Sequence, residues 1–167
     1  MKPPRRLHDK ILSPAGAAAA CRRAAGAGRR VVFTNGCFDI LHPGHVTYLE
    51  EARRKGDFLV VALDTDAAVR KLKGRGRPVN PLKARLAVLA ALESVDAVTW
   101  FGGGNPVPII RRLRPKVLVK GGDWKPAQIL GSREVLGWGG KVHSLRFVAG
   151  KSTTKIIRRI IDTGDNR

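Results

Sequence analysis

The sequence predicts an α/β fold, a Rossmann-like three-layer sandwich around a five-stranded parallel sheet. Short apolar runs alternate with amphipathic stretches along the chain, as expected for repeated strand–helix–strand units. The run FLVVAL at 58–63 contains no polar residue, which is typical of a strand that helices cover on both faces. Ligands of such sheets bind beyond the carboxyl ends of the strands, where the strand order reverses. We therefore expect the chemistry in the loops that follow the strands.

Apolar periodicity and turn residues place the elements in order. The expected strands are 31–34, 58–63, 97–101, 116–120 and 141–147, and the expected helices are 15–25, 43–54, 66–72, 81–92, 106–113 and 152–161. The Asn35-Gly36 pair ends the first strand, Pro81 fits the first turn of its helix, and Ser152 caps the last helix. The stretch at 73–80 is too rich in glycine and charge for the core, so we expect a loop there.

Length and composition predict one main domain. A chain of 167 residues fits a single core, and we expect a helical extension over 1–29, the domain over 30–162 and a tail over 163–167. No apolar segment follows the basic start as in a signal peptide, and no apolar run approaches the roughly 18 residues of a membrane span. We therefore expect a soluble, cytoplasmic protein. Cys21 and Cys37 match no disulfide framework or zinc pattern, so both are expected to be free thiols.

The charge of the chain is strongly positive, with 32 Lys and Arg against 13 Asp and Glu. A net charge of +19 attracts polyanions, so a nucleic-acid-binding module is one alternative. The basic residues are spread along the whole chain, however, and aromatic residues make up only 5%, which leaves little platform for stacking bases. We expect no nucleic-acid partner. A basic proteome background or a site for several phosphates accounts for the charge.

The loop NGCFDILHPGH at 35–45 carries the strongest chemical signal. His42 and His45 stand three residues apart at the mouth of a helix, so their rings point to the same side. Gly44 lets a phosphate chain approach the backbone, and the helix N-terminus supplies N–H groups and a positive dipole. The pattern predicts a triphosphate site in which the imidazoles donate hydrogen bonds to the charge on departing pyrophosphate. Two histidines of this spacing alone would also fit capping, packing or metal binding.

Three later segments carry groups suited to phosphates. Lys71 and Lys73 could neutralise the charge between two anions that must meet, although Lys71 alone would also fit a solvated loop. The planar guanidinium of Arg85 suits a phosphate, with a surface ion pair as the alternative. In GKSTTKII at 150–157, hydroxyl and N–H groups at a helix start predict a site for the triphosphate tail. An ordinary N-cap accounts for Ser152 but not for the two threonines beside it.

These motifs, each after a predicted strand, resemble those of the cytidylyltransferase-like nucleotidyltransferase superfamily. Its hallmarks are a first strand, a G-x-F-D segment and H-x-G-H, and the resemblance extends from about residue 10 to 161. Class I aminoacyl-tRNA synthetases carry a related H-I-G-H element, but this chain has no segment suited to an anticodon or editing region. The resemblance implies that the glycines and acid of VLVKGGDW at 117–124 hold the base and ribose, although Gly-Gly-Asp would also fit a simple turn.

Within the superfamily, TNGCFDILHPGH, LVKGGDW and GKSTTKII are similar to the D-glycero-β-D-manno-heptose 1-phosphate adenylyltransferases. That resemblance implies AMP transfer from ATP to the sugar 1-phosphate, for lipopolysaccharide or related surface glycans. It also implies Mg²⁺ bound through the ATP phosphates, a homodimer, and the free-standing form rather than the form fused to a sugar kinase. Cytidylyltransferases of small alcohol phosphates, such as glycerol 3-phosphate, are the nearest alternative. They usually have threonine at the position of Cys37 and arginine near that of Phe147, and this chain has neither.

Residue patterns and resemblance together assign the site. Nucleotide binding is expected of Phe38, His42, Gly44, His45, Arg85, Gly121, Asp123, Ser152, Thr153 and Thr154. Catalysis is expected of His42, His45 and Lys73, and binding of the sugar phosphate of Asn35, Cys37, Asp39, Lys71, Lys73 and Trp124. No protein metal site and no catalytic thiol are expected. Asp39 is expected to orient either the loop or a substrate hydroxyl. The resulting mechanism is direct in-line attack on the α-phosphorus of ATP.

Overall fold

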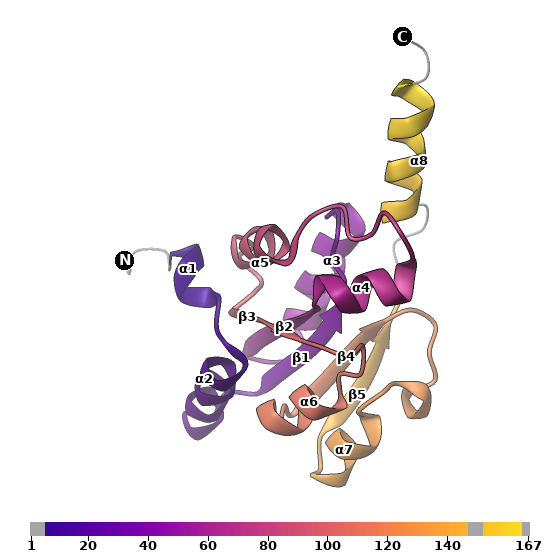
Figure 1. The fold of residues 1–167 in the computed structure, drawn as a ribbon. Coiled ribbons are helices and arrows are strands. Elements are labelled where there is room, and N and C mark those ends of the chain that lie inside the picture. The colour runs from indigo at the N-terminus through magenta and orange to yellow at the C-terminus, as the bar shows by residue number, and fades with distance from the viewer. Residues whose placement is uncertain (1–5, 147–151, 165–167) are drawn as a thin grey trace.

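The computed structural model describes residues 6–146 and 152–164 and confirms the predicted fold class. Five parallel strands form one sheet in the order β3-β2-β1-β4-β5, with helices on both faces (Figure 1). The strands are β1 (Val31–Gly36), β2 (Phe58–Asp64), β3 (Ala97–Phe101), β4 (Val117–Gly121) and β5 (Lys141–Leu145). The order reverses between β1 and β4, so the loops that follow these two strands diverge and leave a crevice at the carboxyl edge.

The helices alternate with the strands, and shorter ones flank them. They are α1 (Leu7–Lys10), α2 (Pro14–Gly26), α3 (Pro43–Arg53), α4 (Asp66–Lys73), α5 (Leu82–Ala90), α6 (Val107–Leu113), α7 (Ser132–Gly137) and α8 (Thr153–Gly164), with a 3₁₀ turn η1 (Pro126–Gln128). Three of these elements, α1, η1 and α7, were not predicted from the sequence. Each has six residues or fewer, which is too short to show a helical period.

The sheet has an apolar core on each face, as the unbroken run of β2 predicts. Phe58, Val60 and Ala62 pack under α2 and α6, while the residues between them pack under α3 and α5. All seven residues of β2 are buried. The segment before β1 belongs to this core, because Ala17 and Cys21 of α2 are at most 1% exposed. Among the described residues, no helix is both long and apolar enough to cross a bilayer.

Helix α3 departs in one position from the packing that its sequence predicts. Apolar spacing predicts Val46, Leu49 and Ala52 on the core face, and Leu49 and Ala52 are fully buried, but Val46 is 36% exposed, so its predicted core position is wrong. Tyr48, two residues further on, is buried on the core face. Its hydroxyl forms hydrogen bonds to Thr34 Oγ1 (2.6 Å) and to the Val119 carbonyl (3.3 Å). These bonds fix α3 against β1 and β4. Phe147, the predicted end of the last strand, lies outside the described residues.

Candidate active site

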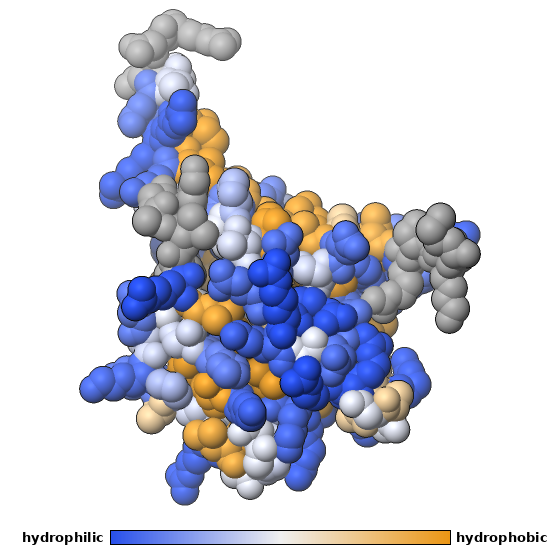
Figure 2. Space-filling model, turned by 180° about the vertical axis from the view of Figure 1, so that it is seen from behind, coloured by the Kyte–Doolittle hydropathy of each residue, from blue (hydrophilic) through white to orange (hydrophobic). Residues whose placement is uncertain are grey.

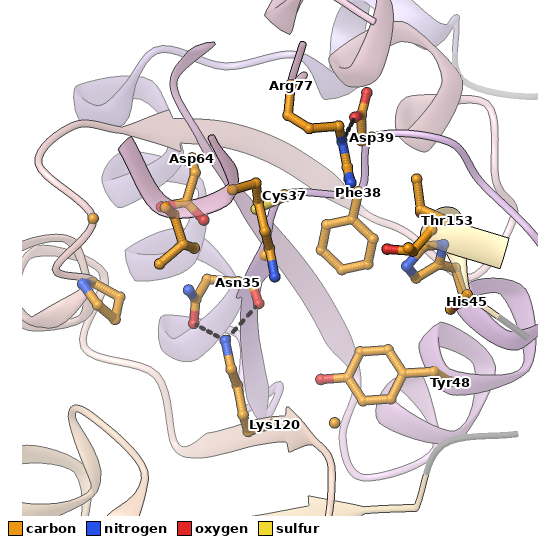
Figure 3. A pocket seen from close by; sticks show the side chains of 18 of the residues that line it. Asn35, Cys37, Phe38, Asp39, His45, Tyr48, Asp64, Arg77, Lys120 and Thr153 are labelled. Atoms are coloured by element: carbon orange, nitrogen blue, oxygen red, sulfur yellow. Dashed lines mark hydrogen bonds and ion pairs between the residues drawn. The ribbon is translucent and has the colours of Figure 1, made fainter. Parts of the chain in front are cut away.

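A cavity of about 750 Å³ opens at the carboxyl edge of the sheet, where the sequence predicts the site. Figure 3 shows side chains from the loop after β1, from α3, from β4 and from the start of α8 around it. The predicted site residues that line it are Asn35, Cys37, Phe38, Asp39, His42, His45, Lys73, Gly121, Trp124, Ser152, Thr153 and Thr154. Four others do not line it, namely Gly44, Lys71, Arg85 and Asp123. Residues far apart in the sequence therefore meet in one pocket.

The two histidines of the loop stack on one another. Their ring centroids lie 3.8 Å apart with an interplanar angle of 19°, and the ring of Phe38 packs at a tilt against His45. Pro43 begins α3 in the helical position that suits its fixed φ, which leaves His42 as the extended residue before the helix. The pair is therefore positioned by a helix start and by an aromatic ring behind it.

His45 is neutral at physiological pH. Burial, with a smaller contribution from His42, lowers the pKa of His45 to about 4. Its Nδ1 atom is buried and has no hydrogen-bond partner among the described residues. A neutral imidazole still carries one N–H donor, and an anion placed beside it would favour the charged form. His45 is thus suited to donate a hydrogen bond to phosphate oxygens.

The depressed pKa of His45 predicts a dependence of stability on pH. Because the unfolded-state pKa of about 6.5 lies above the folded-state value of about 4, the unfolded chain binds more protons between these two pH values. Stability conferred by the neutral ring is therefore lost as the pH falls from about 6.5 to 4, by at most about 3 kcal/mol. Urea unfolding at pH 7 and pH 4.5 checks this for wild type and His45→Ala. The variant should lose less stability, and equal losses would contradict the prediction.

Asp39 joins the histidine loop to the loop after α4. Its carboxylate accepts hydrogen bonds from Arg77 Nε (2.6 Å) and from the backbone N–H groups of Val79 and Asn80 (both 2.9 Å). Burial would raise the pKa of Asp39, but these hydrogen bonds and the charge of Arg77 together lower it. Asp39 as a whole residue is only 3% exposed. Of the two roles expected for Asp39, these contacts match orientation of the loop.

Arg85 also joins loops, and its guanidinium does not reach the cavity wall. It donates to the carbonyl oxygens of Cys37 (2.6 Å) and Asp64 (2.8 Å) and to Asp66 Oδ1 (2.7 Å). A further bond runs from Nε to the Asn80 carbonyl. Arg85 is 1% exposed. Because its donors are already bound to protein oxygens, the phosphate contact expected from the sequence does not agree with this position.

Other predicted residues lie at the margin of the pocket. Lys71 is exposed on α4, Gly44 is buried in the first turn of α3, and Asp123 is exposed beside Trp124. The indole N–H of Trp124 donates to the Gly121 carbonyl (3.1 Å), which holds the ring at the pocket mouth. These positions keep Trp124 and Gly121 beside any base bound after β4.

The start of α8 is held against the histidine loop. Thr153 Oγ1 donates to the Ile40 carbonyl (3.2 Å), and Ser152 Oγ accepts from the Lys155 N–H (3.2 Å). The second contact confirms the predicted N-cap. Thr154 and Lys155 also line the cavity, while Gly150 and Lys151 of the motif lie outside the described residues. Hydroxyl, ammonium and helix N–H groups thus face the same space.

Two charged strand residues in the pocket wall, Asp64 and Lys120, were not predicted from the sequence, and neither were Arg77 and Lys155 outside the strands. Lys120 Nζ donates to the backbone carbonyl (3.1 Å) and the side-chain oxygen (3.3 Å) of Asn35. Burial lowers the pKa of Lys120 and raises that of Asp64, while the attraction between the two opposes both shifts. Both residues stand inside strands, at their carboxyl ends, whereas the predicted site residues lie mainly in the loops beyond. The rule that ligands bind at strand ends was the signal that could have found them.

Cations outnumber acids around the cavity. The basic side chains in its wall belong to Lys73, Arg77, Lys120 and Lys155, and the carboxylates to Asp39 and Asp64. Since Asp39 is already bound to Arg77 and to two backbone N–H groups, the remaining field is positive. The arrangement can hold more than one phosphate and can donate hydrogen bonds to them.

Comparisons with known proteins agree with this geometry. A sequence profile described as cytidylyltransferase-like matches residues 33–159. The bifunctional protein HldE of Alcanivorax borkumensis is 51% identical over 150 residues, which cover 90% of this chain and 32% of HldE. HldE of Halorhodospira halophila is 51% identical over 154 residues, which cover 92% of this chain and 32% of that protein. The chain therefore spans about a third of the length of these curated relatives.

Solved structures show the same fold. The lipopolysaccharide core biosynthesis protein from Thermoplasma volcanium superimposes with a TM-score of 0.60 at 28% identity, over 72% of this chain and 98% of that chain. Pantothenate synthetase from Thermus thermophilus has a TM-score of 0.56 at 18% identity, over 83% of this chain and 62% of that chain, and shares the fold alone. Because the profile covers well over half of the sequence, this chain belongs to the cytidylyltransferase-like family of nucleotidyltransferases.

Proposed function

We propose that this chain transfers AMP from ATP to D-glycero-β-D-manno-heptose 1-phosphate, giving ADP-heptose and pyrophosphate. The observation that carries the proposal is the stacked pair of histidines facing a cation-rich cavity of about 750 Å³. A cavity of this size can hold a nucleotide and a sugar phosphate together, and its cations reduce the repulsion between their phosphates. The motifs TNGCFDILHPGH and LVKGGDW favour the heptose phosphate as acceptor, because they are similar to those of heptose 1-phosphate adenylyltransferases.

The chemistry is one displacement at phosphorus. An oxygen of the sugar phosphate attacks the α-phosphorus of ATP, a new P–O bond forms, and the bond to the β-phosphate oxygen breaks as pyrophosphate leaves. The attacking phosphate is ionised near neutral pH, so no protein nucleophile is needed. His42 and His45 donate hydrogen bonds to oxygens that gain charge in the transition state. Lys73 holds phosphates between the two substrates, and the start of α8 at 152–154 holds the β and γ phosphates.

Mg²⁺ enters this proposal on the triphosphate oxygens. Among residues 6–146 and 152–164, no three His, Cys, Asp or Glu side chains gather into a metal site. Of the two carboxylates that line the pocket, Asp39 is bound to Arg77, whereas Asp64 is not. One carboxylate together with several phosphate oxygens is a ligand set that suits Mg²⁺. The ion would neutralise charge on the triphosphate. Asp64 would thus hold the ion while also facing Lys120.

A substrate matrix tests the proposed activity. Purified protein is given ATP or CTP with either D-glycero-β-D-manno-heptose 1-phosphate or glycerol 3-phosphate, and pyrophosphate release is followed. We expect turnover with ATP and heptose 1-phosphate. Turnover only with CTP and glycerol 3-phosphate would replace the proposal by a cytidylyltransferase. The proposal further includes a cytoplasmic homodimer that supplies surface-glycan precursors and has no nucleic-acid partner.

Replacing Lys120 by methionine is expected to lower kcat/KM by about 10²-fold. The half-buried ammonium is held by Asn35 in the pocket wall, so its loss removes a fixed positive charge from the phosphates. Pyrophosphate release with both substrates varied measures the effect. Lys83→Met, on the exposed side of α5, is the matched control and should keep wild-type kinetics. Wild-type kinetics in Lys120→Met would show that this lysine only supports the loop after β1.

A further inference from the structure

Helix α8 carries an apolar stripe whose outer half is left exposed by the described residues. The helix stands out from the body of the molecule (Figure 1). Ile156, Ile157, Ile160 and Ile161 lie on one face of its 12 residues. Ile160 is 61% exposed, Ile161 is 62% exposed, and no described residue of α8 is buried. A helix of this length is marginally stable alone in water, so a partner on the stripe would stabilise it.

A shallow apolar groove lies on α3, beside the base of α8. It is lined by the apolar residues Leu41, Pro43 and Val46 and by the polar residues His42, Thr47 and Glu50, and its volume is about 540 Å³. The hydrogen bond from Thr153 to the Ile40 carbonyl places the first turn of α8 next to this groove. The rest of α8 extends away from it (Figure 1). Figure 2 shows apolar surface on α8 and along the adjoining edge of the body.

We propose that the chain forms a twofold dimer in which α8 of each copy lies in the α3 groove of the other. Ile160 and Ile161 of the stripe and Val46 of the groove are exposed, and no described residue of the same copy buries them. At helical spacing, Arg158 and Arg159 border the stripe on its two sides, where one of them can pair with Glu50 of the other copy. This pairing matters because a net charge of +19 otherwise opposes self-association.

The arrangement is reciprocal and goes beyond the proposed activity. A twofold axis makes each copy both donor and acceptor of a helix, so every contact occurs twice. The groove wall includes His42, which stacks on His45 in the pocket. The helix of the partner would therefore pack behind the histidine turn, while the start of the chain's own α8 lines the cavity.

Sedimentation equilibrium tests the interface by mass, without any assay of activity. We expect a dimer for wild type and a dissociation constant at least about 100-fold higher for Ile160→Asp and for Val46→Asp, since each charge enters the interface twice. Leu136→Asp, at an exposed leucine of α7, is the matched control and should stay dimeric. Circular dichroism and thermal melting show whether each variant keeps its fold.

A charge exchange separates this interface from other modes of association. Glu50→Arg and Arg158→Glu should each weaken the dimer, and the double variant should regain at least part of the affinity; Arg159→Glu is tested in the same way. A monomeric wild type at all concentrations would overturn the proposal, as would a dimer that survives both aspartate substitutions. Binding of a monomer to phosphatidylglycerol vesicles through α8 would also overturn it, and would assign the stripe to an anionic membrane.

Discussion

Replacing His45 by alanine is expected to lower kcat by about 10²–10³-fold, the loss typical of one donor to a transition-state charge. The structure supports this role because the ring lines the cavity, is neutral near pH 7, and is positioned by His42 and Phe38. KM for ATP should change less than kcat, since the hydrogen bond strengthens as charge develops. Pyrophosphate release at saturating substrates measures the effect.

The control for this prediction is another histidine. His8→Ala removes an exposed ring from α1, on a segment that does not line the cavity, and should leave kcat unchanged. Thermal melting of both variants shows that the fold persists. Near-normal turnover of His45→Ala would remove this histidine from the mechanism. A loss that appears only in KM would assign it to ground-state binding instead.

Replacing Arg85 by methionine is expected to lower the free energy of unfolding by about 3–5 kcal/mol. The change leaves the carbonyl oxygens of Cys37, Asp64 and Asn80 without their donor in a buried place. Arg85→Lys should restore little, because an ammonium cannot reproduce the fork of a guanidinium. Urea unfolding measures the loss, with Arg75→Met in the exposed loop after α4 as the matched control.

Arg85→Met also distinguishes the two roles considered for this arginine. If Arg85 binds phosphate, its replacement should raise KM for ATP and change the free energy of unfolding little. If Arg85 joins loops, its replacement should lower the free energy of unfolding strongly. The contacts predict the second outcome, and unchanged unfolding with a raised KM would restore the phosphate role.

The centre of the sheet could be predicted from the sequence because β1, β2 and β4 begin with runs of apolar residues that are buried. Every residue of β2 is buried, as expected for an apolar run at 58–63 that helices cover on both faces. The first helix after β1 begins at Pro43 as expected. Val46 could not be assigned correctly from apolar periodicity alone, because the hydroxyl of Tyr48 has partners inside the core that a hydropathy pattern does not reveal.

Site residues could be predicted where they belong to one short motif. They could not be predicted where they come together only through the pairing of strands that are distant in the sequence. His42, His45 and Thr153 follow strands in short motifs, and all three line the cavity. Lys120 and Asp64 lie on different strands that flank β1, and spacing along the chain does not show that they share one pocket floor. Arginine and aspartate side chains can either bind a ligand or hold two loops together through buried hydrogen bonds. Only the hydrogen-bond partners seen in the structure distinguish these two roles.

The stereochemical course at phosphorus distinguishes one displacement from two. If one pocket holds both substrates, the sugar phosphate displaces pyrophosphate in a single step. ATP bearing sulfur in one configuration at the α-phosphorus is converted with heptose 1-phosphate, and the configuration of the ADP-heptose analogue is determined. A single in-line displacement inverts the configuration, so we expect inversion. Retention requires two displacements through a covalent adenylyl-protein, and it would rule out direct transfer between the two substrates.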